Sequence, residues 1–383
     1  MAVPLAAGYH GPPELTPLRA LTEWTLDPWA LAFILLLAGL YVAGVRRVRR
    51  TGRLIPGEAG PSGPGPSRPG QSGPSQSGPG QAGPGLASSA PSRPGAGGRR
   101  PPGTSPAGSW PVGRTLAFWL GLGFAVLATM SFVGVYQPVL FYVRSAQTIL
   151  LLLVMPLFLA LSRPLTLAIA ALPRLGGRLQ AAIHSRAAVA LTFPAVTTLV
   201  LVVVPFVLYF SPWYAAGFSS TLVRELTYLA LLVPGFVFFW TLLRIDPVPK
   251  AYPYLVALWI TGAEVVGDAV LGLAVIADQS LIAGAYYHAL ARPWGPSLTS
   301  DQVIGGGVLW VLGDLVGLPF LAAQLIQMIR EDEAEATVID AELDARDAAG
   351  AGAGTGAAGD DKPWWESDPR FANRFQPVDD GGE

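Results

Sequence analysis

The sequence contains no cysteine, and it has only three histidines and four methionines among its 383 residues. The absence of cysteine excludes disulfide bonds, thiolate metal sites and cysteine nucleophiles. The small number of histidines and methionines leaves few side chains that soft metals prefer. The sequence also has no glycine-rich phosphate loop and no nucleophile–histidine pairing, so we do not expect an enzyme.

Charged residues are scarce as well. They make up 13% of the chain, whereas 51% of the residues are hydrophobic and the mean hydropathy is positive. Ordinary soluble proteins of this length do not have that balance, so the lipid bilayer is the expected environment. The net charge of −1 provides no basic surface of the kind that binds nucleic acid.

Seven apolar stretches are long enough to cross a membrane as helices, because one crossing takes about 20 residues. We therefore expect an all-α fold, a polytopic membrane helix bundle with about seven transmembrane helices. The stretches lie near residues 28–45, 114–134, 146–162, 187–210, 221–242, 252–275 and 303–327.

Basic residues predict how these stretches are oriented. Arginine and lysine concentrate after the first, third, fifth and seventh stretches, whereas the opposite loops hold few of them. By the positive-inside rule, the N-terminus lies outside and the C-terminus is cytoplasmic. The cations on the predicted inner side are Arg46, Arg47, Arg49, Arg50, Arg53, Arg163, Arg174, Arg178, Arg186, Arg244, Lys250 and Arg330.

Composition divides the chain into five segments. Residues 1–27 form an N-terminal segment outside the cytoplasm, and residues 28–50 form the first transmembrane helix. Residues 51–110 are nearly all Pro, Gly, Ser, Ala and Gln. They have too little apolar side chain to offset the entropy that is lost when a chain becomes ordered, so this composition predicts a disordered cytoplasmic linker. Residues 111–330 hold the other six helices. Residues 331–383 form an acidic cytoplasmic tail that first extends the last helix. Its tryptophan-rich end suits a docking peptide, an interfacial anchor or a tail without a fixed partner.

Three acidic residues lie away from the ends of the apolar stretches, namely Glu264, Asp268 and Asp314. A charged side chain at the centre of a bilayer costs roughly 2.5–3.5 kcal/mol on insertion scales, so each one needs an explanation. Glu264 and Asp268 are four residues apart and share one face of a helix. The three carboxylates form either a proton or cation path or a set of hydrogen bonds that orients the helices.

Residues 137–164, QPVLFYVRSAQTILLLLVMPLFLALSRP, join a polar cluster to the third apolar stretch. This arrangement resembles the third span of the CtaG family, membrane proteins tied to assembly of haem-copper cytochrome c oxidase. In that family the cluster usually reads His-Met-x-Gln-His. Gln147 matches it, whereas Arg144 and Thr148 stand at the histidine positions. Further similar motifs are Ser211-Pro212-Trp213-Tyr214, Asp246-Pro247-Val248-Pro249, and Asp301-Gln302 followed by Gly305-Gly306 and Leu309-Trp310.

Other histidine positions of the family are also replaced. Where the family has approximately His-x-Leu-Glu-His, this sequence has Arg224-Glu225-Leu226-Thr227-Tyr228. Asp268 stands where the family often has a histidine four residues before a glycine, here Gly272. Neutral imidazole binds a metal, whereas a guanidinium group cannot donate a lone pair.

The resemblance implies a multi-pass protein of a bacterial cell membrane that assists cytochrome c oxidase biogenesis. Contact with oxidase subunits and delivery of copper are the expectations for such a family. Because the histidines are replaced, we expect a scaffold or assembly partner without a bound cofactor, not a direct copper ligand. The alternative comes from another class of protein, a small cation or proton transporter that uses Glu264, Asp268 and Asp314.

The replaced positions also predict a specific arrangement. Arg144, Arg224 and Asp268 should lie at similar depth in the outer half of the membrane. We expect a charge-paired cluster there, in which guanidinium groups bind the carboxylate and hold three spans together. The alternative is that each arginine reaches the membrane interface separately. The other members of this outer polar cluster are Gln147, Thr148 and Tyr228.

Overall fold

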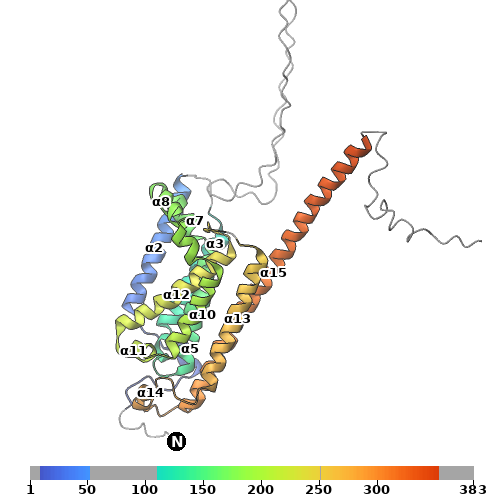
Figure 1. Ribbon diagram of the computed structural model, residues 1–383. Coiled ribbons are helices and arrows are strands. Elements are labelled where there is room, and N and C mark those ends of the chain that lie inside the picture. Colours follow the sequence, from blue (N-terminus) through green and yellow to red (C-terminus); the bar gives the residue numbers. More distant parts are fainter. Residues whose placement is uncertain (1–8, 52–109, 251, 353–383) are drawn as a thin grey trace, which may run out of the picture. The chain divides into compact units, whose positions relative to one another are not determined.

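The computed structural model describes residues 9–51, 110–250 and 252–352 (Figure 1). All regular structure in these residues is helical, which confirms the all-α class. The predicted linker, apart from its first and last residues, and the tryptophan-rich end of the tail lie outside the described residues. The helices are α1 (Pro17–Thr22), α2 (Pro28–Thr51), α3 (Val112–Met130), α4 (Phe132–Tyr136), α5 (Phe141–Ile149), the π-helical turn η1 (Leu150–Val154), α6 (Met155–Leu161), α7 (Pro164–Ala171), α8 (Pro173–Ile183), α9 (Arg186–Leu191), α10 (Pro194–Tyr209), α11 (Trp213–Ser219), α12 (Thr221–Leu243), α13 (Tyr254–Ala277), α14 (Gly284–Leu290) and α15 (Leu298–Gly352).

The chain divides into two units, residues 1–324 and residues 325–383. The first unit contains the helical bundle, and the second contains the C-terminal part of α15. In the second unit, the side chains of residues 331–346 are exposed, in keeping with their acidic and alanine-rich sequence. All the packing described below belongs to the first unit.

Six helical stretches in the described part of the chain are long and apolar enough to cross a membrane, and they follow the predicted order. A seventh crossing results if α10 and α11, which meet at a bend of 66°, count as one span. The prediction of about seven transmembrane helices is therefore confirmed by length and composition. The six stretches are Pro28–Thr51, Val112–Tyr136, Phe141–Leu161, Thr221–Leu243, Leu255–Ala277 and Leu298–Arg346.

The fourth predicted stretch, 187–210, differs most from the structure. Its first residues form the separate helix α9, and α10 begins only at Pro194. Proline suits the first turn of a helix, because an N–H group at that position would have no partner within the helix. The 16 residues of α10 are few for a full crossing, and the chain continues through α11 after the bend.

The third span is the most enclosed of the six stretches, with 72% of its most apolar part buried. It is interrupted by the π-helical turn η1 between α5 and α6. Pro156 follows this turn and has no N–H, so the carbonyl of Leu152 lacks its usual helical donor. Gly235 of α12 lies against that carbonyl, and a Cβ at this position would be only 1.8 Å from the Leu152 oxygen. A glycine therefore permits the close approach of α12 to the third span.

The Asp301-Gln302 motif at the start of α15 joins several helices at one end of the bundle. The Asp301 carboxylate accepts hydrogen bonds from the Tyr142 N–H at 3.0 Å and from Arg292 Nη2 at 3.1 Å. The Gln302 side chain accepts from the Ile282 N–H at 2.9 Å. Its amide nitrogen donates to the loop after α13, so this motif connects α5, α13 and α15. The carbonyls that accept from Gln302 are those of Val275, Asp278 and Ser280.

The opposite end contains a second contact between residues that are distant in the sequence, centred on Asp246. Its carboxylate accepts from the N–H groups of Leu165 at 3.0 Å and Thr166 at 2.8 Å, and from the Thr166 hydroxyl. It thereby satisfies the first N–H groups of α7, which have no partner within the helix. Burial raises the pKa of the Asp246 carboxyl, and these hydrogen bonds oppose the rise.

Candidate functional site

Arg144 of α5 is a buried cation, with 2% of its surface exposed. Its Nη1 donates to Gln137 Oε1 at 2.5 Å. The guanidinium carbon lies 5.3 Å from the centre of the Tyr214 ring and 5.0 Å from that of Phe218. Nη2 has no hydrogen-bond partner among the described residues. A carbonyl oxygen and two aromatic faces therefore surround this charge, in place of the predicted carboxylate.

Gln147 and Thr148, one turn further along α5, connect to three other helices. Gln147 Nε2 donates to the Ala128 carbonyl at 2.7 Å and to the Tyr228 hydroxyl at 3.4 Å. The Thr148 and Tyr209 hydroxyls share a hydrogen bond of 3.0 Å. The structure thus brings Gln147 and Tyr228 of the predicted cluster together, while Thr148 bonds to a tyrosine that the sequence analysis did not include.

A group of tyrosines extends this polar region toward α14. The hydroxyls of Tyr214 and Tyr287 lie 2.9 Å apart, and both residues are buried. Burial raises the pKa of Tyr287, so its hydroxyl stays protonated and available for hydrogen bonding. The sequence analysis missed the role of these residues. The available signal was the Ser211-Pro212-Trp213-Tyr214 motif, which the bend between α10 and α11 brings over Arg144.

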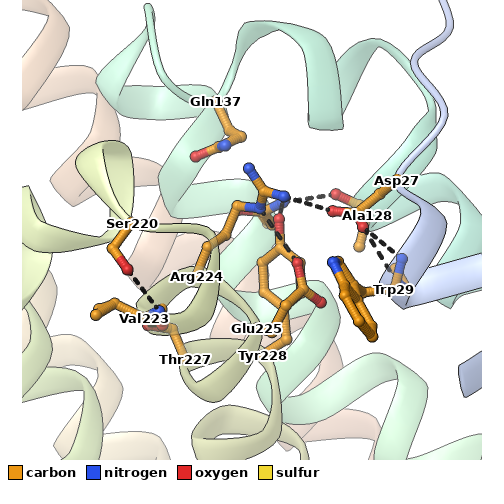
Figure 2. A network of polar contacts seen from close by, with 12 residues as sticks. Asp27, Trp29, Ala128, Gln137, Ser220, Val223, Arg224, Glu225, Thr227 and Tyr228 are labelled. Atoms are coloured by element: carbon orange, nitrogen blue, oxygen red, sulfur yellow. Dashed lines mark hydrogen bonds and ion pairs between the residues drawn. The ribbon is translucent and has the colours of Figure 1, made fainter.

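Arg224, at the start of α12, forms an ion pair with Asp27, as Figure 2 shows. Arg224 Nη2 lies 3.1 Å from Asp27 Oδ2, and Arg224 Nε lies 3.3 Å from Glu225 Oε1. Asp27 Oδ1 accepts from the N–H groups of Trp29 and Ala30 and so caps α2. This contact connects the starts of α2 and α12. Asp27 could have been found from the sequence, because an aspartate before proline and an apolar run is a helix-start signal.

Asp268 forms no ion pair with Arg144 or Arg224 in the described part of the chain, where Arg224 binds Asp27 and Glu225 instead. The ion pairs of the described residues therefore do not include the predicted pairing of Arg144 and Arg224 with Asp268. The physical reason is that Asp268 belongs to the α13–α15 contact, where its Oδ2 lies against Gly313. A Cβ on Gly313 would be 2.3 Å from that oxygen.

The three intramembrane carboxylates form a separate group between α13 and α15. Glu264 is 1% exposed and Asp268 is 4% exposed, and both interact electrostatically with Asp314. Each has one carboxylate oxygen without a hydrogen-bond partner among the described residues. One turn away, the Thr261 hydroxyl donates to Gln324 Oε1 at 3.0 Å and so joins the same two helices. Sequence analysis correctly placed Glu264 and Asp268 on one face.

The residues at the family's histidine positions do not fit a copper ion. A guanidinium has no lone pair to donate, and the neutral hydroxyls of Thr148 and Tyr228 are poor ligands for a soft metal. Within the ranges that the structure describes, no three His, Asp or Glu side chains are grouped as a metal site would require. The chemistry present is instead that of a buried hydrogen-bonded cluster.

Apolar helices that enclose a buried polar cluster define a polytopic membrane protein. Residues 97–331 match the family described as cytochrome c oxidase caa3 assembly factor, or CtaG. The chain therefore belongs to this family, which confirms the resemblance stated from its motifs.

Three mycobacterial proteins, each named only as uncharacterized, are also similar to this chain. Those of Mycobacterium bovis and Mycobacterium tuberculosis are 31% identical to it over 244 residues, and that of Mycobacterium leprae is 30% identical over 249 residues. Each match covers 62% of this chain and 37% of the relative, so the chain spans less than half the length of these proteins. No solved structure matches the chain.

Proposed function

We propose that this protein assists the assembly of cytochrome c oxidase as a membrane-embedded partner of oxidase subunits, and that it neither ligates copper nor catalyses a reaction. Family membership supports the oxidase context. One observation carries the finer part of the proposal: three residues at the family's histidine positions have partners within the bundle. Arg144 binds Gln137, Thr148 binds Tyr209, and Arg224 binds Asp27.

The proposal also includes an orientation in a bacterial cell membrane. The polar cluster around Arg144 lies toward the outer face, and the arginine-rich segment from α7 to α9 lies toward the cytoplasm. The distribution of arginine supports this orientation, because cytoplasmic loops carry more cations. The cluster would then stabilise the surface on which an oxidase subunit rests during assembly.

Affinity purification from native membranes, combined with copper analysis, tests this function. We expect oxidase subunits to co-purify with the protein, without stoichiometric copper. A variant with both Arg144→His and Thr148→His provides the matched comparison, because it places two imidazoles one helical turn apart. Stoichiometric copper in the wild-type protein, at the level of this variant, would overturn the proposal, and so would the absence of oxidase subunits.

A second candidate function is cation or proton transport through Glu264, Asp268 and Asp314. The observation that favours it is the buried, unpartnered oxygen on each carboxylate within the described residues. Reconstitution of a variant carrying Glu264→Gln, Asp268→Asn and Asp314→Asn separates the two functions. If oxidase assembly persists in cells while an ion flux of the wild-type protein disappears, transport is the function. If assembly fails and no flux exists in either protein, the assembly proposal stands.

A further inference from the structure

A cavity of about 420 Å³ lies beside the Arg224–Asp27 ion pair, between α2, α3, the third span and α12. Its size falls within the range of roughly 300–1,000 Å³ that is usual for small-molecule sites. Trp29, Leu222 and Leu229 form its rim and are exposed, whereas Ala125 and Met155 form its floor and are buried. The cavity therefore opens sideways, toward the region that lipid chains occupy around a membrane protein.

The lining of this cavity is almost entirely hydrocarbon. Water in such a space would lack the two to four polar partners that it needs. If the space were empty, the side chains that line it would lack dispersion contacts on one side. A flexible hydrocarbon chain from the bilayer satisfies both conditions, because it is apolar and can follow an irregular wall. The occupant is therefore expected to carry an alkyl chain.

Polar groups lie at only one end of the cavity. Glu225 and Tyr228 of α12 line this end, and Figure 2 shows both side chains near Trp29. Arg224 is shared between the carboxylates of Asp27 and Glu225, so this group contains two acidic side chains and one cation. Both oxygens of Asp27 are already bound, by Arg224 and by the N–H groups that it caps. Glu225 is therefore the carboxylate that can accept a hydrogen bond from a further donor.

The Tyr228 hydroxyl complements Glu225 one helical turn deeper. It accepts a hydrogen bond from Gln147 Nε2, so its own proton is available to an acceptor in the cavity. A ligand with an acceptor oxygen near Tyr228 and a cationic donor near Glu225 would form a hydrogen bond at each of these two residues. A phospholipid with an amine head has these groups in this order, with the ammonium outermost and the ester carbonyl next to the chain.

We propose that this cavity binds an amine-headed phospholipid, with its ammonium group at Glu225, an ester carbonyl at Tyr228 and one acyl chain against Ala125 and Met155. The lipid proposal does not depend on the oxidase proposal, because its ligand comes from the bilayer and its test needs no oxidase subunit. An amine head is favoured over an anionic one because Glu225 repels phosphate groups that lack a compensating cation. Bound in this way, the lipid fills the gap between α2 and α12.

Native mass spectrometry of the purified protein tests this site. The full chain is placed in nanodiscs that contain equal amounts of phosphatidylethanolamine and phosphatidylglycerol, and the lipids retained after detergent dilution are counted. We expect the wild-type protein to retain phosphatidylethanolamine preferentially. Leu229→Trp, which fills the cavity from its rim, should reduce retention about tenfold, corresponding to the loss of about 1.4 kcal/mol of binding free energy.

Two further variants make the test specific. Leu226→Trp is the matched control, because Leu226 is an exposed residue of the same helix that does not line the cavity. It should retain lipid as the wild-type protein does. Glu225→Gln should retain lipid but lose the preference for the amine head. Unchanged retention in Leu229→Trp would overturn the proposal, as would equal retention of both lipids by the wild-type protein.

Discussion

At the scale of single residues, Arg144 illustrates how a buried charge can be stabilised without an acid. Each aromatic face near a desolvated guanidinium contributes about 1 kcal/mol or more, and the hydrogen bond to Gln137 adds to this. The ring faces come from α11, which the bend after α10 positions over α5. The charge therefore depends on aromatic residues that are distant in the sequence.

This dependence predicts that Arg144→Lys is not a conservative change. Lysine retains the charge, but it lacks the planar group that lies over Tyr214 and Phe218. We expect the free energy of unfolding to fall by about 1–3 kcal/mol, measured by thermal or denaturant unfolding in detergent. Arg178→Lys on α8 is the control, because Arg178 is exposed and should change stability by less than about 0.5 kcal/mol. Equal stability of the two variants would contradict this account of Arg144.

The residue scale also marks the limit of what the sequence could predict. Gln147 and Tyr228 were expected in one cluster, and they do lie within hydrogen-bond distance. The partner of Arg224 was predicted to be Asp268, whereas the structure has Asp27. Local patterns locate a charge within a span, but they contain no information about which helices become neighbours. Pairing across almost 200 positions of the chain is decided by packing of the whole bundle.

At the scale of elements, the membrane helices were predictable because each needs a long apolar run. The interruptions were not, since mean hydropathy is the same for a straight helix and for a bent or π-helical one. Pro156 and Gly235 contained the relevant signal, but only the structure places one helix against the other. The resulting contact between the Leu152 carbonyl and Gly235 is a close approach of two backbones.

This contact predicts that Gly235→Ala destabilises the protein. The added Cβ would lie 1.8 Å from the Leu152 oxygen, so α12 must move away from the third span. We expect a loss of about 2 kcal/mol or more, which exceeds the gain of up to about 1 kcal/mol from helix propensity. Gly262→Ala on α13 is the matched control, because nothing lies within 4 Å of the added atom. Unfolding experiments in which both variants match the wild-type protein would rule out this close contact.

At the scale of the whole molecule, the absence of cysteine makes the orientation directly measurable. Ser280→Cys places a thiol in the loop between α13 and α14, and His184→Cys places one between α8 and α9. A maleimide that does not cross membranes should label Ser280→Cys in intact cells. It should label His184→Cys only after the membrane has been permeabilised. The wild-type protein, which has no thiol, supplies the background.

The reverse labelling pattern would show that the N-terminus is cytoplasmic. It would also move the polar cluster around Arg144 to the inner face of the membrane. Labelling of both variants in intact cells would indicate a different number of crossings between α8 and α14. The experiment therefore tests the positive-inside argument separately from the fold.

The glycine contacts between α13 and α15 have a consequence for the acidic residues. Gly272 faces Gly306, Asp268 faces Gly313, and Glu264 lies near Gly317, so the two helices run in opposite directions in one register. A slide by one turn, about 5.4 Å, would place a side chain at two of these three contacts, because only Gly313 and Gly317 are themselves one turn apart. The glycines therefore fix the positions of both carboxylates along α15. A mutation that shifts this register would relocate the acids even though their sequence positions stay unchanged.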